Sequence, residues 1–437
     1  MRKAKGRGNR GAGGVPPGRE THRHAPQRHS PGTHRRADVG VTTPATVDPQ
    51  PRAHGLMIAT LAAGNFAIGM GAFVVIGVLS PLAADLGLSR TDAGLVMTVY
   101  AVAYAVLSPL LVAFTGNFGR RMVLAVGLAV FAAASVLAVV AWNGQALYAA
   151  RILAAVGGGL FTPVAASVAF SASAPEARGR ALARVFLGFT LAQALGVPLG
   201  SFVGYTFGWR AAFAIVAVLS VTTLVLVLRT VPRRVAFQPN SLRTLVEALA
   251  DWRGLVSILV TATIIAAPYF VYTFITPLLE ARMGFGRDGV ALVLLVYGAG
   301  AVAGSFAAGG WTDRFGAVRT IYGVLAMQIL LMPAFSFLPV PVPVLLLLTF
   351  FWAMFGWSFL VPQQTRLVRQ SPERQAVVLS LNAACIYLGA SLGSAAGGIV
   401  AAKFGLDWLG LAGMLAILLA TVHLFLSESL FRGRRAT

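Results

Sequence analysis

Long runs of apolar residues dominate the chain from about residue 56 onward. They lack the three-and-four spacing of an amphipathic helix, so helices formed from them are expected to be apolar on all sides. A helix needs about 20 mainly apolar residues to cross the core of a bilayer. Twelve segments meet this requirement: 57–79, 92–114, 122–141, 147–170, 182–205, 210–229, 254–279, 288–310, 318–337, 342–364, 376–401 and 408–427. The pattern predicts an all-α membrane protein with twelve transmembrane helices.

The segments fall into two sets of six, within 55–229 and 254–427, on either side of the longest gap, 230–253. Each set has a basic gap after its second and fourth segments. Such duplication is typical of transporters in which two bundles rock about a site at the membrane midplane. We expect two pseudo-symmetric six-helix bundles and a short tail at 428–437. The linker also predicts a short helix on the membrane surface through an amphipathic set: Leu242, Leu245, Val246 and Leu249.

The first 54 residues are rich in Arg, Gly, Pro and His and contain no apolar run. Such a segment cannot bury enough surface to fold alone, and it lacks the hydrophobic core of a signal peptide. Two interpretations stand. The segment is a disordered basic tail that contacts anionic lipid, or translation begins downstream, at Val41 or Met57.

Composition and charge exclude other classes of protein. Only 11% of the residues are charged and 57% are hydrophobic, whereas a soluble domain has about 25% charged residues. The net charge of +21 at first suggests nucleic acid. However, 11 of the 35 Lys and Arg residues precede Leu56, and most others lie in short gaps between apolar runs. This distribution is typical of topology signals in a lipid bilayer and indicates no nucleic-acid partner.

The loop charges predict the orientation, because cytoplasmic loops carry the excess of Lys and Arg. With the amino terminus inside, the gaps on the outer side hold only Arg90, Arg210, Arg282, Arg287 and Lys403. The cytoplasmic gaps hold more: Arg120, Arg121, Arg178, Arg180, Arg184, the linker arginines, Arg314, Arg319, Arg366, Arg369 and Arg374. We therefore expect a multi-pass protein of the cell membrane with both termini in the cytoplasm.

Two gaps carry a loop motif. The gap after the eighth segment, GGWTDRFG (309–316), fits Gly-x-x-x-Asp-Arg-x-Gly through Gly309, Asp313, Arg314 and Gly316. It resembles the loop motif of the major facilitator superfamily, and the resemblance implies that fold and a gate latch at these residues. The gap after the second segment, TGNFGRR (115–121), keeps Gly119, Arg120 and Arg121 but has Gly116 and Asn117 where the family has Asp and Arg. Any latch there is expected to be weaker.

Further stretches resemble one branch of that family. The stretch LGVPLGSFVGYTFGWRAAF (195–213), which begins in the fifth segment, resembles the span-5 motif of proton-driven exporters. VYTFITPLL (271–279) and LNAACIYLGASLGSAAGG (381–398) resemble arabinose-efflux and chloramphenicol-efflux permeases, in the drug:proton antiporter branch. The resemblance covers about residues 56–427 and implies a hinge and seal at Gly196, Pro198 and Gly200. The alternative is that these residues serve helix packing alone.

Polar and aromatic residues within the apolar segments are the candidates for a substrate cavity. Arg151 stands out, because an Arg at the bilayer centre costs about 2.5–3.5 kcal/mol and usually faces the bundle interior. The alternative is an Arg near a helix end whose head reaches the interface. The family resemblance places the cavity on spans 1, 4, 7 and 10. The candidates are Asn65, Phe66, Phe73, Arg151, Phe161, Gln193, Tyr269, Tyr272, Trp352, Trp357 and Asn382.

No strong acid is visible inside a span. The related exporters often carry a Glu in the first span, where this chain has Ala72, so Asp92 and Glu280 at span ends are the fallback proton carriers. No nucleotide-binding loop, hydrolase triad or metal-ligand cluster occurs, so we expect neither an enzyme nor a cofactor.

The leading hypothesis is a monomeric exporter of a small amphipathic compound (drug, sugar or metabolite) in exchange for protons. The alternatives are an uncoupled facilitator, an importer of a sugar or nucleoside, and a non-transporting membrane sensor.

Overall fold

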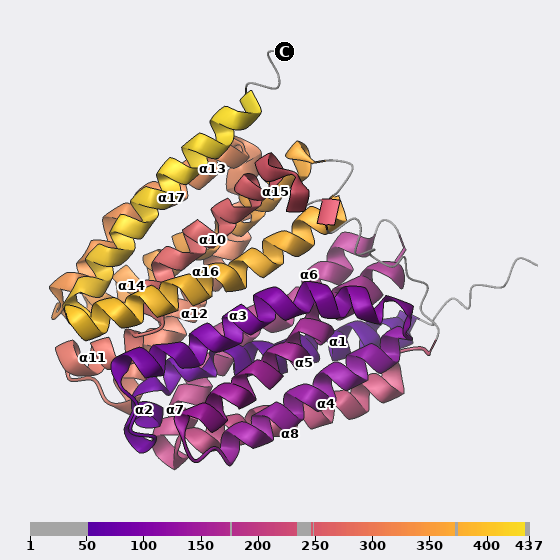
Figure 1. Cartoon of the computed structure of the whole chain (residues 1–437), viewed down its shortest axis with the longest axis horizontal. Coiled ribbons are helices and arrows are strands. Elements are labelled where there is room, and N and C mark those ends of the chain that lie inside the picture. The colour runs from indigo at the N-terminus through magenta and orange to yellow at the C-terminus, as the bar shows by residue number, and fades with distance from the viewer. Residues whose placement is uncertain (1–50, 175–176, 234–245, 248, 372–374, 433–437) are drawn as a thin grey trace, which may run out of the picture. The chain divides into compact units, whose positions relative to one another are not determined.

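The computed structural model describes residues 51–174, 177–233, 246–247, 249–371 and 375–432. Nearly all of the basic amino-terminal segment, most of the linker's amphipathic stretch and the last five residues lie outside this part. Within the described residues, twelve helical spans are long and apolar enough to cross a membrane, which confirms the predicted all-α fold with twelve spans. Figure 1 shows the arrangement of the helices.

The first half contains spans 1–6. Its elements are α1 (Pro51–Gly77), α2 (Leu79–Asp85), α3 (Arg90–Phe114), η1 (Thr115–Asn117), α4 (Arg120–Val139), α5 (Gly144–Ser171), α6 (Arg178–Leu191), η3 (Ala192–Gly196), α7 (Val197–Phe207) and α8 (Trp209–Thr230). Span 5 consists of α6, η3 and α7. The first helix begins at Pro51, slightly earlier than the end of the expected tail.

The second half contains spans 7–12. Its elements are α10 (Trp252–Tyr272), α11 (Ile275–Met283), α12 (Arg287–Phe315), α13 (Ala317–Leu331), η4 (Met332–Phe337), α14 (Val342–Trp357), α15 (Leu360–Gln370), α16 (Gln375–Lys403), η6 (Leu406–Trp408) and α17 (Leu409–Arg432). The last helix runs past the expected end at residue 427. We call the end of the bundle that carries the start of α1 and the end of α17 proximal. The opposite end, with α2 and α11, is distal (Figure 1).

Caps and glycines set the helix boundaries. The side chain of Ser89 accepts a hydrogen bond from the amide of Asp92 and begins α3, and Asn143 begins α5 in the same way (2.8 Å). Gly208 separates α7 from α8 with a φ of 88°. A side chain rarely adopts that backbone conformation, so glycine permits the sharp turn between two adjacent spans.

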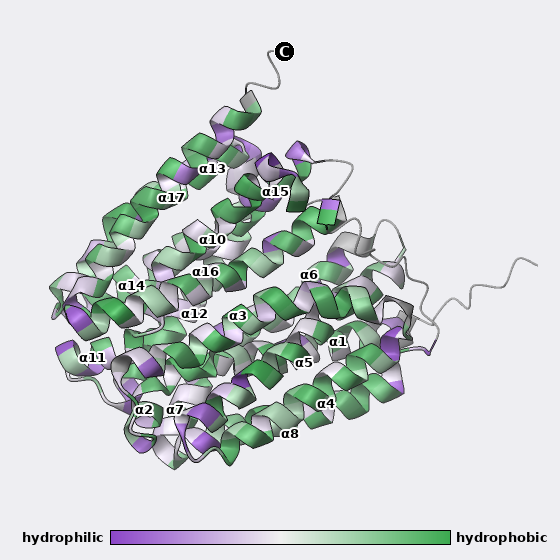
Figure 2. Ribbon diagram, viewed as in Figure 1, coloured by the Kyte–Doolittle hydropathy of each residue, from purple (hydrophilic) through white to green (hydrophobic). Residues whose placement is uncertain are grey.

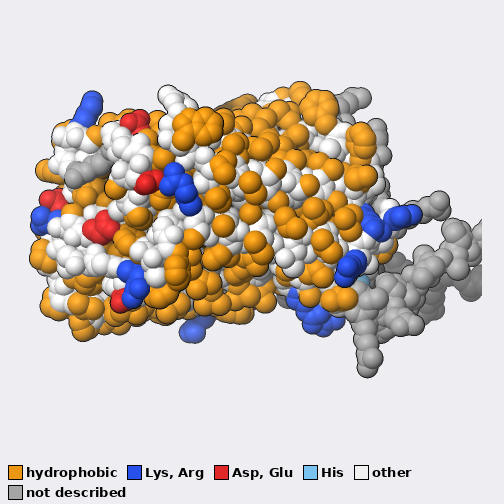
Figure 3. Space-filling view, turned by 90° about the horizontal axis from the view of Figure 1, so that it is seen from below, with side chains coloured by type: hydrophobic (Ala, Val, Ile, Leu, Met, Phe, Trp, Pro, Cys, Tyr) orange, Lys and Arg blue, Asp and Glu red, His pale blue; other side chains and the backbone are white. Residues whose placement is uncertain are grey.

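The surface matches a lipid environment. Apolar residues cover the helices along most of their length, while polar residues lie mainly at their ends (Figure 2). On the face drawn in Figure 3, hydrophobic side chains fill the middle and charged ones gather mostly at the two ends. Large exposed apolar side chains such as Leu419 and Phe425 on α17 therefore face lipid.

The two halves meet along two seams. Helix α3 packs against α16, and η3 and α7 pack against α12. Small residues allow the second seam to close, because a Cβ on Gly298 of α12 would lie only 2.3 Å from the Cα of Ala194. Spans 2 and 5 thus contact spans 11 and 8 of the other half.

Asp85 ties the distal loop of the first half together. It forms an ion pair with Arg210, and its carboxylate accepts a hydrogen bond from the indole of Trp209 (3.0 Å). The hydrogen bond from Arg210 holds the pKa of Asp85 below its usual value, and the hydrogen bond from Trp209 adds a smaller effect in the same direction. A lowered carboxyl pKa stabilises the fold above the unfolded pKa of about 4, and this contribution is lost as the pH falls through the folded pKa.

We therefore expect Asp85→Asn to lower the melting temperature slightly at pH 7, as for a largely exposed pair. Thermal unfolding in detergent at several pH values measures the effect. The difference from wild type should shrink as the pH falls below 4, and an unchanged difference at pH 3.5 would contradict the assignment.

Candidate functional site

Arg151 lies deep inside the first half. It is seven residues from the distal start of α5, about 10 Å along the helix, and is 1% exposed. Its guanidinium donates to the carbonyls of Gly71 (2.7 Å) and Ala72 (2.8 Å) on α1 and, more weakly, to Val96 on α3 (3.3 Å). The side chain therefore does not reach the interface. It joins spans 1, 2 and 4 through their backbone.

The charge of Arg151 has no ionic partner among the described residues. Besides the three carbonyls, its guanidinium carbon lies 4.3 Å from the centre of the Tyr100 ring. A cation held by carbonyl dipoles and a ring face is stabilised less than one paired with a carboxylate. Arg151 thus places a positive charge inside the first half, where it can attract an electronegative group of a bound molecule.

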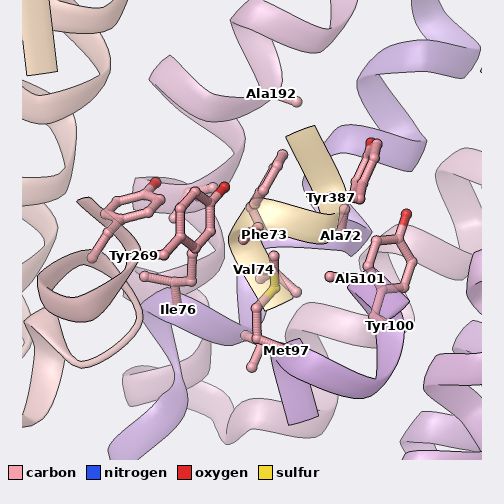
Figure 4. Close-up of a cluster of buried hydrophobic side chains, with 14 of the residues drawn as sticks. Ala72, Phe73, Val74, Ile76, Met97, Tyr100, Ala101, Ala192, Tyr269 and Tyr387 are labelled. Atoms are coloured by element: carbon pink, nitrogen blue, oxygen red, sulfur yellow. The ribbon is translucent and has the colours of Figure 1, made fainter. Parts of the chain in front are cut away.

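Aromatic side chains from both halves form a buried cluster near the membrane centre. The rings of Tyr104 on α3 and Tyr387 on α16 stack at 3.7 Å across the seam between the halves. In the second half, Tyr272 stacks on Tyr297 at 4.1 Å, and Trp352 packs edge-on against Tyr297 at 5.2 Å. Figure 4 shows Tyr269, Phe73, Tyr387 and Tyr100 within this region. We call these aromatic side chains, together with Phe189, the ring cluster.

Several polar atoms in and beside the ring cluster have no hydrogen-bond partner. They are the hydroxyls of Tyr100 and Tyr272, the indole nitrogen of Trp352 and the amide oxygen of Gln193. All four side chains are at most 3% exposed. Leaving a buried polar group unpaired costs about 1–3 kcal/mol, so these atoms are available to a polar group of a bound molecule.

Other candidates serve contacts within one half. Asn65 donates to the carbonyl of Val185 (3.1 Å) and joins α1 to α6. Phe161 occupies the space beside Gly64, where a Cβ would lie 2.2 Å from its ring. Phe66 is half-buried against the core, and Phe73 meets Phe189 edge-on at 5.6 Å. Of these, only Phe73 and Phe189 belong to the ring cluster.

Asn382 belongs to a separate polar network in the proximal part of the second half. It accepts a hydrogen bond from Thr261 (2.5 Å), and Thr261 in turn accepts one from Gln363 (3.1 Å). Arg366 then joins Gln363 (3.2 Å) to Glu428 on α17 (2.5 Å). Sequence reasoning missed Glu428 because the expected end of span 12 left it in the tail.

Trp357, a predicted candidate, lies beside the ring cluster, whereas four tyrosines of the cluster were not predicted. Trp357 donates its indole N–H to the hydroxyl of Tyr297 (3.1 Å) and so borders the ring cluster. Tyr100, Tyr104, Tyr297 and Tyr387 were not singled out from the sequence. The available signal was a tyrosine inside an apolar span, since a buried Tyr needs a partner for its hydroxyl.

Polar contacts between the halves gather in the distal part of the bundle. Thr276 on α11 donates to the carbonyl of Ile76 on α1 (2.7 Å), and the hydroxyl of Tyr205 on α7 donates to Glu280 on α11. Arg287 at the start of α12 contacts Thr206 on α7 (3.3 Å). Together with the seam between α3 and α16, these contacts form what we call the distal seal.

Span 5 changes its helical geometry at the predicted hinge. Residues Ala192–Gly196 form a π-helical turn, and Pro198 is the second residue after it. Proline donates no amide hydrogen, and π turns inside helices often mark functional sites. Gly196 and Gly200 face α1 closely, because a Cβ would lie 3.2 Å from Met70 and 2.4 Å from Val74, respectively.

The two motif loops lie at the proximal end. Among the described residues, neither Asp313 nor Arg314 makes a hydrogen bond or an ion pair, and Gly309 has open space around it. Gly316 turns the chain into α13 with a φ of 81°. In the first half, Arg120 donates to the carbonyl of Gly116 (3.0 Å).

Arg121 holds the carbonyl of Leu228 at the end of α8, so it links the motif loop to span 6. Gly119 caps α4 and has only the carbonyl oxygen of Arg233 nearby, at 3.9 Å from a Cβ placed there. The first loop is thus held inside its own half. Asp313 of the second loop makes no hydrogen bond or ion pair with any described residue.

Comparisons with known proteins agree with this architecture. The chain is 27% identical over 371 residues to an uncharacterized MFS-type transporter, YbcL of Bacillus subtilis, covering 84% of this chain and 95% of that one. It is 29% identical over 368 residues to the inner membrane transport protein YdhP of Escherichia coli, covering 84% and 94%.

Solved structures share the fold. A bacterial homologue of the human lysosomal transporter Spinster, inward-facing and unoccupied, has a TM-score of 0.69 at 18% identity, covering 87% of this chain and 98% of that one. The nucleoside transporter NupG has a TM-score of 0.72 at 15% identity, covering 86% and 100%. A family model described as Major Facilitator Superfamily matches residues 61–394. The chain therefore belongs to the major facilitator superfamily and is a multi-pass secondary transporter of that type.

Proposed function

We propose that this transporter exports a small amphipathic compound in exchange for protons by alternating access, as a monomer with both termini in the cytoplasm. The observation that carries the alternating-access mechanism is the distal seal. In the proposed orientation the distal end faces outward, and a closed distal seal is what an inward-facing state requires. Separation of Tyr205 from Glu280 and of Thr276 from Ile76 would open the outer side.

The unengaged loop residues support the same assignment. A latch on the cytoplasmic side is expected to form when that side closes and to break when it opens. Asp313 is free of hydrogen bonds to described residues, as an inward-facing state requires of a broken latch. The hinge proposed at Gly196, Pro198 and Gly200 lies where span 5 meets the other half.

The ring cluster supports an amphipathic substrate. Stacked rings supply apolar surface, and the unpaired atoms of Tyr272, Trp352 and Gln193 supply a few hydrogen-bonding positions. The site contains Arg151 but no carboxylate among the described residues. It therefore favours neutral or electronegative compounds over organic cations.

We propose Glu280 as the proton carrier. Its carboxylate accepts a hydrogen bond from Tyr205 of the other half, so a proton on Glu280 would change a contact that must break in every cycle. Asp92 is a poorer candidate, because Ser89 donates to its carboxylate (2.6 Å) within the cap of α3.

Replacing Glu280 tests the coupling. We expect Glu280→Gln to abolish the acceleration of transport by a pH gradient while counterflow of substrate continues. Asp407→Asn is the matched control, since Asp407 lies at the same end and pairs with Arg282 of its own half, outside the distal seal. Transport of Glu280→Gln that still follows the pH gradient would remove Glu280 from the mechanism.

A sensitivity screen of a deletion strain first identifies a transported compound, and purified protein in vesicles then tests direction and coupling. Addition of substrate to acid-loaded vesicles should alkalinise the lumen if export is coupled to protons. The second candidate is an uncoupled facilitator, which the lack of a central carboxylate among the described residues favours. It predicts substrate flux without a change in lumen pH.

A further inference from the structure

A cavity lies at the proximal end of the second half. It has a volume of about 750 Å³ and is lined by the junction of α12 with α13, the end of α15 and the end of α17. None of its lining residues belongs to the ring cluster. The cavity therefore requires an explanation apart from the transported compound.

The cavity carries uncompensated positive charge. Its ionisable lining residues are Arg319, Arg366, Arg369 and Glu428. Arg366 is not available to a ligand. Its guanidinium donates hydrogen bonds to Glu428 (2.5 Å) and Ser427 (2.5 Å), and its side chain is 2% exposed. Arg319 and Arg369 are exposed and make no hydrogen bond or ion pair with any described residue. Three guanidinium groups against one carboxylate leave two positive charges for a ligand.

The backbone adds to the same preference. Ala317, Val318 and Arg319 form the first turn of α13 and line the cavity. The amide groups of a first turn have no partner within the helix, and the helix dipole favours an anion there. Arginine side chains suit phosphate oxygens in particular, because the planar guanidinium can donate two parallel hydrogen bonds.

The surroundings indicate which phosphate compound is bound. The cavity lies at the ends of four spans, at the level of lipid headgroups, and Phe431 of α17 forms part of its wall. Phe315 at the end of α12 also lines the cavity and is 49% exposed, so an acyl chain can leave the cavity across Phe315 and Phe431. Basic pockets between spans on the cytoplasmic side are typical sites for anionic headgroups.

We propose that this cavity binds an anionic phospholipid, with Arg319 and Arg369 contacting the phosphate and the acyl chains lying against Phe315 and Phe431. The phosphate group also occurs in soluble compounds. The acyl chains beside Phe315 and Phe431 distinguish the proposed ligand from a free phosphate ester.

Native mass spectrometry of the detergent-purified chain tests the proposal, with phosphatidylglycerol as the probe. Phosphatidylcholine and glycerol 3-phosphate are the comparison ligands. The double variant Arg319→Ala/Arg369→Ala should bind phosphatidylglycerol at least roughly tenfold more weakly than wild type. The charge-retaining double variant Arg319→Lys/Arg369→Lys should bind more tightly than the alanine variant, because both charges remain, and more weakly than wild type, because the paired hydrogen bonds are lost.

The matched control is Arg180→Ala/Arg184→Ala, which removes two exposed arginines of α6 in the other half. It should bind phosphatidylglycerol like wild type. Equal loss in both alanine variants would indicate diffuse surface attraction and overturn the proposal. Equal binding of phosphatidylcholine, or binding of glycerol 3-phosphate without retention of the lipid, would also overturn it. All variants should melt within a few degrees of wild type, because the replaced side chains are exposed.

Discussion

Arg151→Lys is expected to reduce transport by at least tenfold while the protein still folds. The guanidinium reaches carbonyls on two helices at once, Gly71 and Ala72 on α1 and Val96 on α3. The ammonium of a lysine is a compact charge on a flexible side chain, so it cannot donate to all three carbonyls as the planar guanidinium does. The hydrogen bonds of a charged donor contribute about 1.5–3 kcal/mol each, and at least one would be lost.

The retained charge keeps the cost to folding small. Removing the charge entirely, as in Arg151→Ala, would also leave a cavity and several unpaired carbonyls, so Lys is the more informative change. Uptake of the identified compound into vesicles measures transport, and thermal unfolding measures stability. Arg184→Lys, on the exposed face of α6, should leave both unchanged. Full activity of Arg151→Lys would exclude Arg151 from the transport mechanism.

Gly298→Val is expected to open the distal seal. A Cβ on Gly298 would lie 2.3 Å from the Cα and 2.8 Å from the carbonyl oxygen of Ala194, across the boundary between the halves. Backbone atoms of a helix cannot move aside alone, so the halves must separate. Overpacking of this kind costs about 1–3 kcal/mol, enough to shift a two-state equilibrium by roughly 5- to 150-fold.

Thiol labelling measures this shift. In a background in which the single cysteine, Cys385, is replaced by Ala, Thr276→Cys places a buried thiol in the distal seal. Its reaction with a maleimide should be at least about tenfold faster with Gly298→Val than without it. Gly310→Val is the control on the same helix, since a Cβ there meets nothing within 4 Å. Equal labelling rates in both variants would show that the seal does not depend on this crossing.

The sequence predicted the twelve spans because lipid imposes a simple rule. Each span needs about 20 apolar residues, and this rule depends on no contact between helices. The predicted span boundaries were wrong where a helix extends beyond its apolar run. Span 12 continues to Arg432, so Glu428 joined a buried pair that the hydropathy pattern assigned to the tail.

The site was less predictable because its geometry depends on contacts between distant segments. The burial of Arg151 could be anticipated from the cost of a charge in lipid, but its carbonyl partners could not. Tyr104 and Tyr387 are far apart in the sequence and meet only where spans 2 and 11 cross. The π turn before Pro198 likewise depends on how span 5 packs against α1 and α12.

In the proposed mechanism the halves separate at the distal end during every transport cycle. A disulfide across the seam between α3 and α16 tests it most directly. A Cβ on Gly398 would lie 3.6 Å from the Cα of Thr91, a spacing that a disulfide can bridge. In the Cys385→Ala background, Thr91→Cys/Gly398→Cys should transport when reduced, stop when oxidised and recover after reduction, while each single-cysteine variant is unaffected by oxidation. Transport at the reduced rate by protein shown by mass spectrometry to be fully cross-linked would contradict the account.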